Sequence, residues 1–85
     1  MNETIQRVRQ LLATRLKLAT EVDQIGDETL LFDPAGAGLD SIDALELVLG
    51  LEKEFGVVIE DREVAMKVLV SIQTIARYVE SQRKG

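Results

Sequence analysis

Residues 38–56 read GLDSIDALELVLGLEKEFG, and this stretch carries the clearest structural pattern in the chain. Apolar residues recur in it at intervals of three and four, which is the period of one face of an α-helix. The pattern predicts a helix from Ser41 to about Phe55, with Gly56 as a left-handed C-terminal cap. The residues predicted to face the core are Ala44, Leu47, Val48, Leu51 and Phe55.

A second apolar set on the same helix points to a different face, and it consists of Ile42, Leu45 and Leu49. Three acids accompany it: Asp43, Glu46 and Glu52. An apolar strip flanked by carboxylates has the composition of a protein-docking surface. The spacing alone leaves docking and burial inside a bundle equally open.

Three further helices are predicted around this one. The first spans about Glu3 to Leu18, where the apolar residues at helical intervals are Ile5, Val8, Leu12, Leu16 and Ala19. The segment DREVAMKVL, residues 61–69, predicts a short third helix. Ser71 is placed to cap a fourth helix, whose inward residues are Ile72, Ile75, Ala76 and Val79. No strand alternation is sustained, so we expect an all-α fold: a small four-helix bundle with three main helices and a short third one.

A long connection, residues 20–39, separates the first two predicted helices. Its glycines and its proline oppose a further regular helix. A connection of this length in a small domain usually has a function. We expect Leu30, Leu31 and Phe32 to fix it to the core.

Length and composition exclude several functions. The 85 residues predict one domain, residues 1–85, with a small core and no deep active site. The sequence has no cysteine and no histidine, which removes thiolate chemistry and the commonest general base and metal ligand, so no metal site is expected. The opening MNETIQRVRQ lacks the apolar core of a signal peptide, and no apolar run reaches about 18 residues. The expected location is the cytoplasm.

The net charge of −5 is concentrated in the middle of the chain. Residues 40–63 hold eight acids and two bases, which give −6, while the other seven acids and eight bases give +1. Such a field repels nucleic acid and anionic membranes, and it steers a basic protein partner toward this segment. An ordinary solvated face carries similar charge, so charge alone does not establish a partner.

Ser41 stands between Asp40 and Asp43 at the start of the second predicted helix, and it has two interpretations. In the first, it only caps the helix, although the two acids also suit the cap and the first turn. In the second, a group is attached to it, because a helix start favours an anion and an exposed turn is open to another enzyme.

Catalysis by Ser41 itself is poorly supported. There is no histidine to activate the hydroxyl, no G-x-S-x-G turn and no lysine nearby. The loop PAGAG, residues 34–38, is not followed by Gly-Lys-Ser/Thr, so it is not a phosphate-binding P-loop. The segment DPAGAGLDSIDA lacks the acids that a calcium-binding loop needs.

The stretch GLDSIDALELVLGLEKEFGVVI, residues 38–59, resembles the signature of the acyl carrier proteins, in which Gly-x-Asp-Ser-Leu opens the second helix. LLFDPAG, residues 30–36, is similar to the anchored part of that family's first loop, and SIQTIARYV, residues 71–79, is similar to its final helix. The resemblance implies that Ser41 receives 4′-phosphopantetheine from coenzyme A, with Asp40 as its acidic neighbour. It also places two sets of residues on the family's recognition helix and so favours docking: Ile42, Leu45 and Leu49, and Asp43, Glu46 and Glu52.

The implied function is transport of acyl groups as thioesters, without catalysis, for fatty acid synthesis or for specialised lipid or polyketide synthesis. The implied partners are a phosphopantetheinyl transferase and acyl-processing enzymes with basic docking patches, and the chain is expected to be a monomer. Some features resemble carriers dedicated to one pathway: Ile42 in place of leucine, a longer loop before the motif, a longer third-helix segment and a basic first helix. Two alternatives stay open, an aminoacyl or peptidyl carrier and an unmodified helical adaptor.

Overall fold

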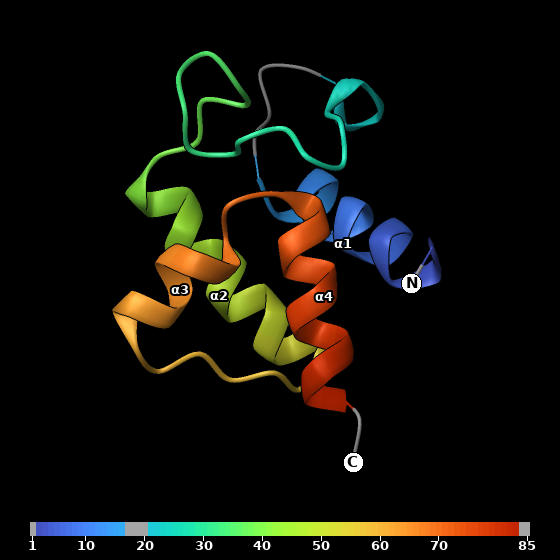
Figure 1. The fold of residues 1–85 in the computed structure, drawn as a ribbon, viewed down its shortest axis with the longest axis vertical. Coiled ribbons are helices and arrows are strands. Elements are labelled where there is room, and N and C mark those ends of the chain that lie inside the picture. Colours follow the sequence, from blue (N-terminus) through green and yellow to red (C-terminus); the bar gives the residue numbers. More distant parts are fainter. Residues whose placement is uncertain (1, 17–20, 84–85) are drawn as a thin grey trace.

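The computed structural model describes residues 2–16 and 21–83, and over these ranges the ordered elements are helices without any β-strand. Four α-helices and one short 3-10 helix follow one another along the chain (Figure 1). Their bounds are α1 Asn2–Arg15, η1 Val22–Gln24, α2 Ser41–Phe55, α3 Arg62–Val68 and α4 Ile72–Arg83. The predicted all-α class and the short third helix are confirmed.

Helix α1 packs against both α2 and α4, and α3 packs against α4. The largest fully buried side chains come from α1, the loop, α2 and α4, and they are Val8, Leu12, Leu31, Leu47, Leu51, Ile72, Ile75 and Val79. A Cβ atom at Gly50 would lie 2.7 Å from Cδ of Arg15, so the glycine permits the close approach of α1 to α2. All four inward residues predicted for α4 are buried.

The ends of the helices follow from local chemistry. Helix α2 has the predicted bounds, and Gly56 caps its C-terminus. The N–H of Gly56 donates to the carbonyl oxygen of Glu52, and the φ of 70° at Gly56 lets the N–H of Val57 donate to the carbonyl oxygen of Leu51. Asp61 caps α3 by accepting a hydrogen bond from the N–H of Glu63. Before α4, Oγ of Ser71 accepts a hydrogen bond from the N–H of Thr74, as expected for a cap.

Helix α1 ends at Arg15, short of the predicted Leu18. Leu16 continues its hydrogen-bond pattern by donating to the carbonyl of Leu12, and it is buried as predicted. The remaining part of that prediction, at residues 17–19, lies outside the described residues. Leu11 is also buried, although it was not assigned to the predicted stripe.

The long connection between α1 and α2 lies over one end of the bundle (Figure 1). Arg9 of α1 holds its first part by donating hydrogen bonds to the carbonyl oxygens of Val22 and Ile25, at 2.8 and 2.6 Å. Two backbone hydrogen bonds join its later part to the segment before α4 and to α4 itself, from Leu31 N–H to Val70 O and from Gln73 N–H to Asp27 O. The connection is therefore a fixed part of the bundle.

The prediction for the apolar residues of this connection was right for two of three. Leu31 is fully buried, and Phe32 packs partly buried against the core. Leu30 is 50% exposed, so the prediction that it fixes the connection was wrong. Three consecutive residues cannot all point to one side, and the two backbone hydrogen bonds of Leu31 orient that residue inward.

Candidate functional site

The first turn of α2 is closed by a capping box built from two carboxylates. Oδ1 of Asp40 accepts hydrogen bonds from the N–H groups of Ile42 and Asp43, each at 3.1 Å. In return, Oδ2 of Asp43 accepts a hydrogen bond from the N–H of Asp40 at 3.0 Å. Three backbone donors at the helix start are thus satisfied, and both acids occupy the positions predicted for them.

Ser41 is therefore the first residue of α2 and not its cap. Its side chain is exposed, and its hydroxyl has no hydrogen-bond partner within the described residues. The interpretation of Ser41 as a cap alone was wrong, because Asp40 already performs that task. The hydroxyl is open to solvent at the positive end of the helix dipole, where a negatively charged group is stabilised.

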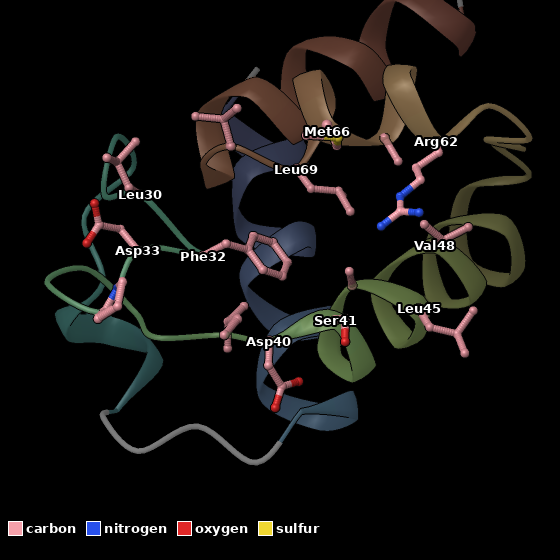
Figure 2. Close-up of a pocket in the computed structure, with 15 residues that line it drawn as sticks. Leu30, Phe32, Asp33, Asp40, Ser41, Leu45, Val48, Arg62, Met66 and Leu69 are labelled. Atoms are coloured by element: carbon pink, nitrogen blue, oxygen red, sulfur yellow. The ribbon is translucent and has the colours of Figure 1, made fainter.

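A cleft of about 960 Å³ opens beside Ser41, between α2, α3 and the long connection. Figure 2 shows Phe32 from the connection and Leu69 from the end of α3 turned into it, with Val48 on the side of α2. Most of its lining side chains are apolar, so an apolar chain that enters is shielded from water. Ser41 itself belongs to the lining, so the free hydroxyl lies at the margin of the cleft.

The two apolar faces predicted for α2 differ clearly in exposure. Leu47 and Leu51 are fully buried, while Ile42, Leu45 and Leu49 are 72%, 61% and 40% exposed. Three other residues of the predicted core face pack against the core only partly buried: Ala44, Val48 and Phe55. For Ala44 and Val48 the reason is the cleft, which they line, and Phe55 lies under the guanidinium of Arg7.

The three acids beside the exposed apolar strip have different surroundings. Asp43 is held in the capping box. Glu46 is half-buried and pairs with Arg15 of α1, with 3.8 Å between Nη1 and Oε1. Glu52 is exposed, and the structure gives its side chain no ion pair among the described residues. Over the same part of the chain, no group of three or more potential ligands is placed to hold a metal ion.

Sequence reasoning missed the far wall of the cleft, which includes Arg62, Met66 and Val70 of α3 and the segment after it. Met66 is 70% exposed, and its place opposite α2 depends on how α3 packs on α4. One signal was present in the sequence. Arg62 is a cation in the first turn of a helix, where the helix dipole disfavours positive charge. Interactions within α3 therefore do not explain an arginine at this position.

Comparison with known proteins identifies the family to which the chain belongs. The model of a family described as "Phosphopantetheine attachment site" matches residues 6–79. An acyl carrier protein of Campylobacter hominis is 34% identical over 83 residues, which cover 98% of both chains. Acyl carrier protein 2, chloroplastic, of Hordeum vulgare is 29% identical over 79 residues, which cover 93% of this chain and 57% of that protein.

Two solved structures are also similar, and both are of an engineered Bradyrhizobium japonicum glycine:carrier-protein ligase complexed with a carrier protein from Agrobacterium tumefaciens. In the complex with ATP, the similar chain has a TM-score of 0.78 at 32% identity, and the match covers 92% of this chain and 97% of that one. In the complex with AMP, the similar chain has a TM-score of 0.74 at 39% identity, and the match covers 94% of this chain and 99% of that one.

The family model matches most of this small helical bundle, and the similar proteins are carrier proteins. The chain is therefore a carrier protein. The chain belongs to the family with a phosphopantetheine attachment site, and its relatives named above include acyl carrier proteins. The prosthetic group of this family is 4′-phosphopantetheine. Among the described residues, no helix combines the length and the apolar character needed to cross a bilayer.

Proposed function

We propose that Ser41 is the residue to which 4′-phosphopantetheine is attached, and that the chain carries its cargo from there. The observation that carries this proposal is a free, exposed hydroxyl at the start of α2, whose cap is supplied by Asp40 instead. When bound, the prosthetic group supplies a thiol that holds the cargo as a thioester. This thiol is then the sole thiol on the polypeptide, because the sequence has no cysteine.

Attachment needs a second protein. In this step the oxygen of the Ser41 hydroxyl forms a bond to the pantetheine-side phosphorus of coenzyme A, the nucleotide part leaves and the hydroxyl loses its proton. The chain has no histidine, and the nearest carboxylates, Asp40 and Asp43, are engaged in the capping box. A phosphopantetheinyl transferase therefore provides the base, and the carrier provides an accessible hydroxyl.

The exposed face of α2 is the proposed docking surface for this transferase and for the enzymes that load and process the cargo. The apolar strip Ile42, Leu45 and Leu49 offers area for burial, and each side chain contributes roughly 1.5–3 kcal/mol when fully buried. The acids Asp43, Glu46 and Glu52 attract a basic partner and speed its approach. The carrier acts in the cytoplasm as a non-catalytic monomer, and it binds neither nucleic acid nor membranes.

An acyl group is the cargo that the site supports best. The cleft beside Ser41 is mostly apolar, and its volume of about 960 Å³ exceeds what a few carbon atoms need. Acyl carrier proteins are also among the relatives of this chain, although relatives do not fix the pathway. Fatty acid synthesis and a dedicated lipid or polyketide pathway both use such cargo.

An aminoacyl group is the second candidate, and a specific observation favours it. A chain 39% identical to this one is in the structure of a glycine:carrier-protein ligase with a carrier protein. The acidic segment of residues 40–63 weighs mildly toward acyl cargo, because carriers for amino acids tend to have fewer acids there. Parallel loading reactions, one with a glycine ligase and one with an acyl-loading enzyme, separate the two candidates.

The attachment is tested by intact mass after incubation with a phosphopantetheinyl transferase, Mg²⁺ and coenzyme A. We expect the native chain to gain one phosphopantetheine group and Ser41→Ala to gain none. Ser81→Ala is the matched control, because Ser81 is also an exposed helical serine, and its hydroxyl donates to the carbonyl of Tyr78. A Ser41→Ala chain that still gains the group contradicts the proposal.

A further inference from the structure

Arg62 is a charged side chain in an otherwise mostly apolar cleft, and its role is not explained by the fold. Figure 2 shows its side chain extending from the start of α3 toward α2, and Arg62, although exposed to solvent, lines the cleft together with Val48 of α2. The other charged residues of the lining are Asp33 and Asp40. Both are engaged locally, since Asp33 accepts a hydrogen bond from the N–H of Ala35 and Asp40 caps α2.

Arg62 has no such engagement. Within the described residues it makes no ion pair and no side-chain hydrogen bond, although acids surround it in the sequence. Its position in the first turn of α3 gives it no stabilisation from that helix, because the helix dipole opposes a cation there. Its five N–H donors therefore remain available to a group that enters the cleft.

The position of Arg62 relative to Ser41 suggests which group that is. Val48 follows Ser41 by seven residues on α2, and a rise of 1.5 Å per residue places them about 10 Å apart along the helix axis. A chain that begins at Ser41 and follows the apolar wall of α2 thus passes Val48 inside the cleft that Arg62 also lines. A guanidinium binds carboxylates and phosphates through paired hydrogen bonds.

We propose that Arg62 is a binding residue of the cleft, which binds an anionic oxygen group introduced from Ser41. This inference rests on the proposed function. Two sources have this chemistry: the phosphodiester that links the arm to Ser41, and a carboxylate at the far end of the cargo. In the second case the carrier favours acyl groups of dicarboxylic acids over neutral acyl groups of the same length.

The test uses four forms of the full chain: unmodified, bearing phosphopantetheine alone, loaded with octanoyl, and loaded with octanedioyl. Each form is made for the native chain and for Arg62→Gln, and intact mass verifies the loading. Lys67→Gln is the matched control, because Lys67 is an exposed cation of the same helix that does not line the cleft. The readouts are the melting temperature and the ¹⁵N resonance of the Arg62 side-chain Nε–H group.

If the cargo carboxylate is the source, the octanedioyl form melts about 4 °C above the octanoyl form. The difference is lost in Arg62→Gln, is retained in Lys67→Gln, and is partly retained in Arg62→Lys, which keeps the charge without the planar fork. If the phosphodiester is the source, the Arg62 resonance already moves when phosphopantetheine is attached, and both acyl forms then behave alike. Either result supports the proposal.

The proposal is overturned if the Arg62 resonance is unchanged in all four forms and Arg62→Gln behaves like Lys67→Gln. That result leaves the proposed function intact, because intact mass still records the group on the chain. A native chain that gains no mass contradicts the proposed function itself, and this inference with it.

Discussion

At the scale of single residues, the start of α2 separates two tasks that the sequence places side by side. Asp40 caps the helix through two backbone N–H groups, and Ser41 keeps its hydroxyl free. The motif Asp-Ser therefore puts the stabilising interaction on the acid and leaves the serine open to chemistry. A serine that also capped the helix would lose its cap on modification.

This division predicts that two neighbouring substitutions change the free energy of unfolding by different amounts. Asp40→Ala removes the capping box and lowers the free energy of unfolding by about 0.5–2 kcal/mol. Ser41→Ala changes it by no more than about 0.5 kcal/mol, because the hydroxyl contributes no contact to the fold. Urea unfolding of both variants measures the difference, and Asp40→Asn, which keeps a good cap, is the control. Equal losses at both positions contradict this account of the cap.

The sequence was sufficient to predict that α2 begins at Ser41 and that Asp40 and Asp43 lie at its cap and in its first turn, because a helix start is a local structure. It was not sufficient to predict that Arg62 lines the cleft, because Arg62 lies 21 residues after Ser41 and the packing of the bundle brings the two residues to the same cleft. Glu46 is similar, since its ion pair with Arg15 depends on the close approach of α1 to α2 at Gly50. Contacts of this kind have no signal in the spacing of residues along one helix.

At the scale of helices, α2 is the element that has both a buried face and an exposed apolar face. One face fills the core with Leu47 and Leu51, and another leaves Ile42, Leu45 and Leu49 in solvent. The structure resolves the alternatives that spacing left open for the position of this strip. Its role in binding a partner stays a prediction.

Substitutions on the two faces of α2 are expected to have different consequences. Leu47→Ala leaves a cavity in the core and costs about 2–5 kcal/mol of stability. Leu45→Ala costs distinctly less, because Leu45 is 61% exposed, and it weakens binding of the transferase and of loading enzymes instead. Thermal unfolding and partner titrations measure the two effects. If Leu45→Ala binds its partners as tightly as the native chain, the strip is not the docking surface.

The connection between α1 and α2 is the second informative element, and its anchoring could not be predicted. Helical periodicity says nothing about a segment without regular structure, so η1 and the contacts of Arg9 were missed. Arg9 is partly buried, with 14% of its side chain exposed, and it donates hydrogen bonds to two backbone carbonyl oxygens and to Asp27. The charged side chain of Arg9 therefore stabilises the conformation of the loop.

Arg9→Met is accordingly expected to destabilise the chain by about 1.5–3 kcal/mol, because the carbonyl oxygens of Val22 and Ile25 lose a charged donor. Arg7→Met is the matched control on the same helix. Arg7 is more exposed, its ion pair with Glu54 is long, at 3.9 Å, and its contact with the Phe55 ring is a solvent-accessible cation–π contact, so its loss costs about 1 kcal/mol. Hydrogen exchange of residues 21–31 identifies where the structure opens. Similar protection in both variants contradicts the anchoring role.

At the scale of the whole molecule, charge is distributed unevenly along the chain, and the excess of acids falls on the segment that holds the exposed apolar strip of α2. Residues 40–63 carry a net charge of −6 and the remaining residues carry +1, so the whole chain has a net charge of −5. This asymmetry orients the approach of a basic partner before contact is made. Of the three acids at the strip, Glu52 is the most suitable for a test, because Glu46 is paired with Arg15 and Asp43 supports the cap.

We expect Glu52→Lys to slow association with the loading enzymes while leaving stability nearly unchanged. Glu28→Lys is the control, since it changes the net charge equally but lies on the exposed long connection. Added salt reduces the association rate of the native chain, because exposed charges are screened beyond about 8–10 Å. Stopped-flow association rates at several salt concentrations measure both effects. If both variants and all salt concentrations give one rate, the acids serve solubility alone.

The central claim, that cargo is attached through Ser41, is tested most directly by locating the modification within the chain. Trypsin releases residues 18–53 as one peptide, and Ser41 is its single serine, while Ser71 and Ser81 fall in other peptides. After reaction with the transferase and coenzyme A, fragmentation of this peptide is predicted to place the phosphopantetheine group on Ser41. A modification on any other residue, or a reacted chain whose 18–53 peptide stays unmodified, would contradict the account.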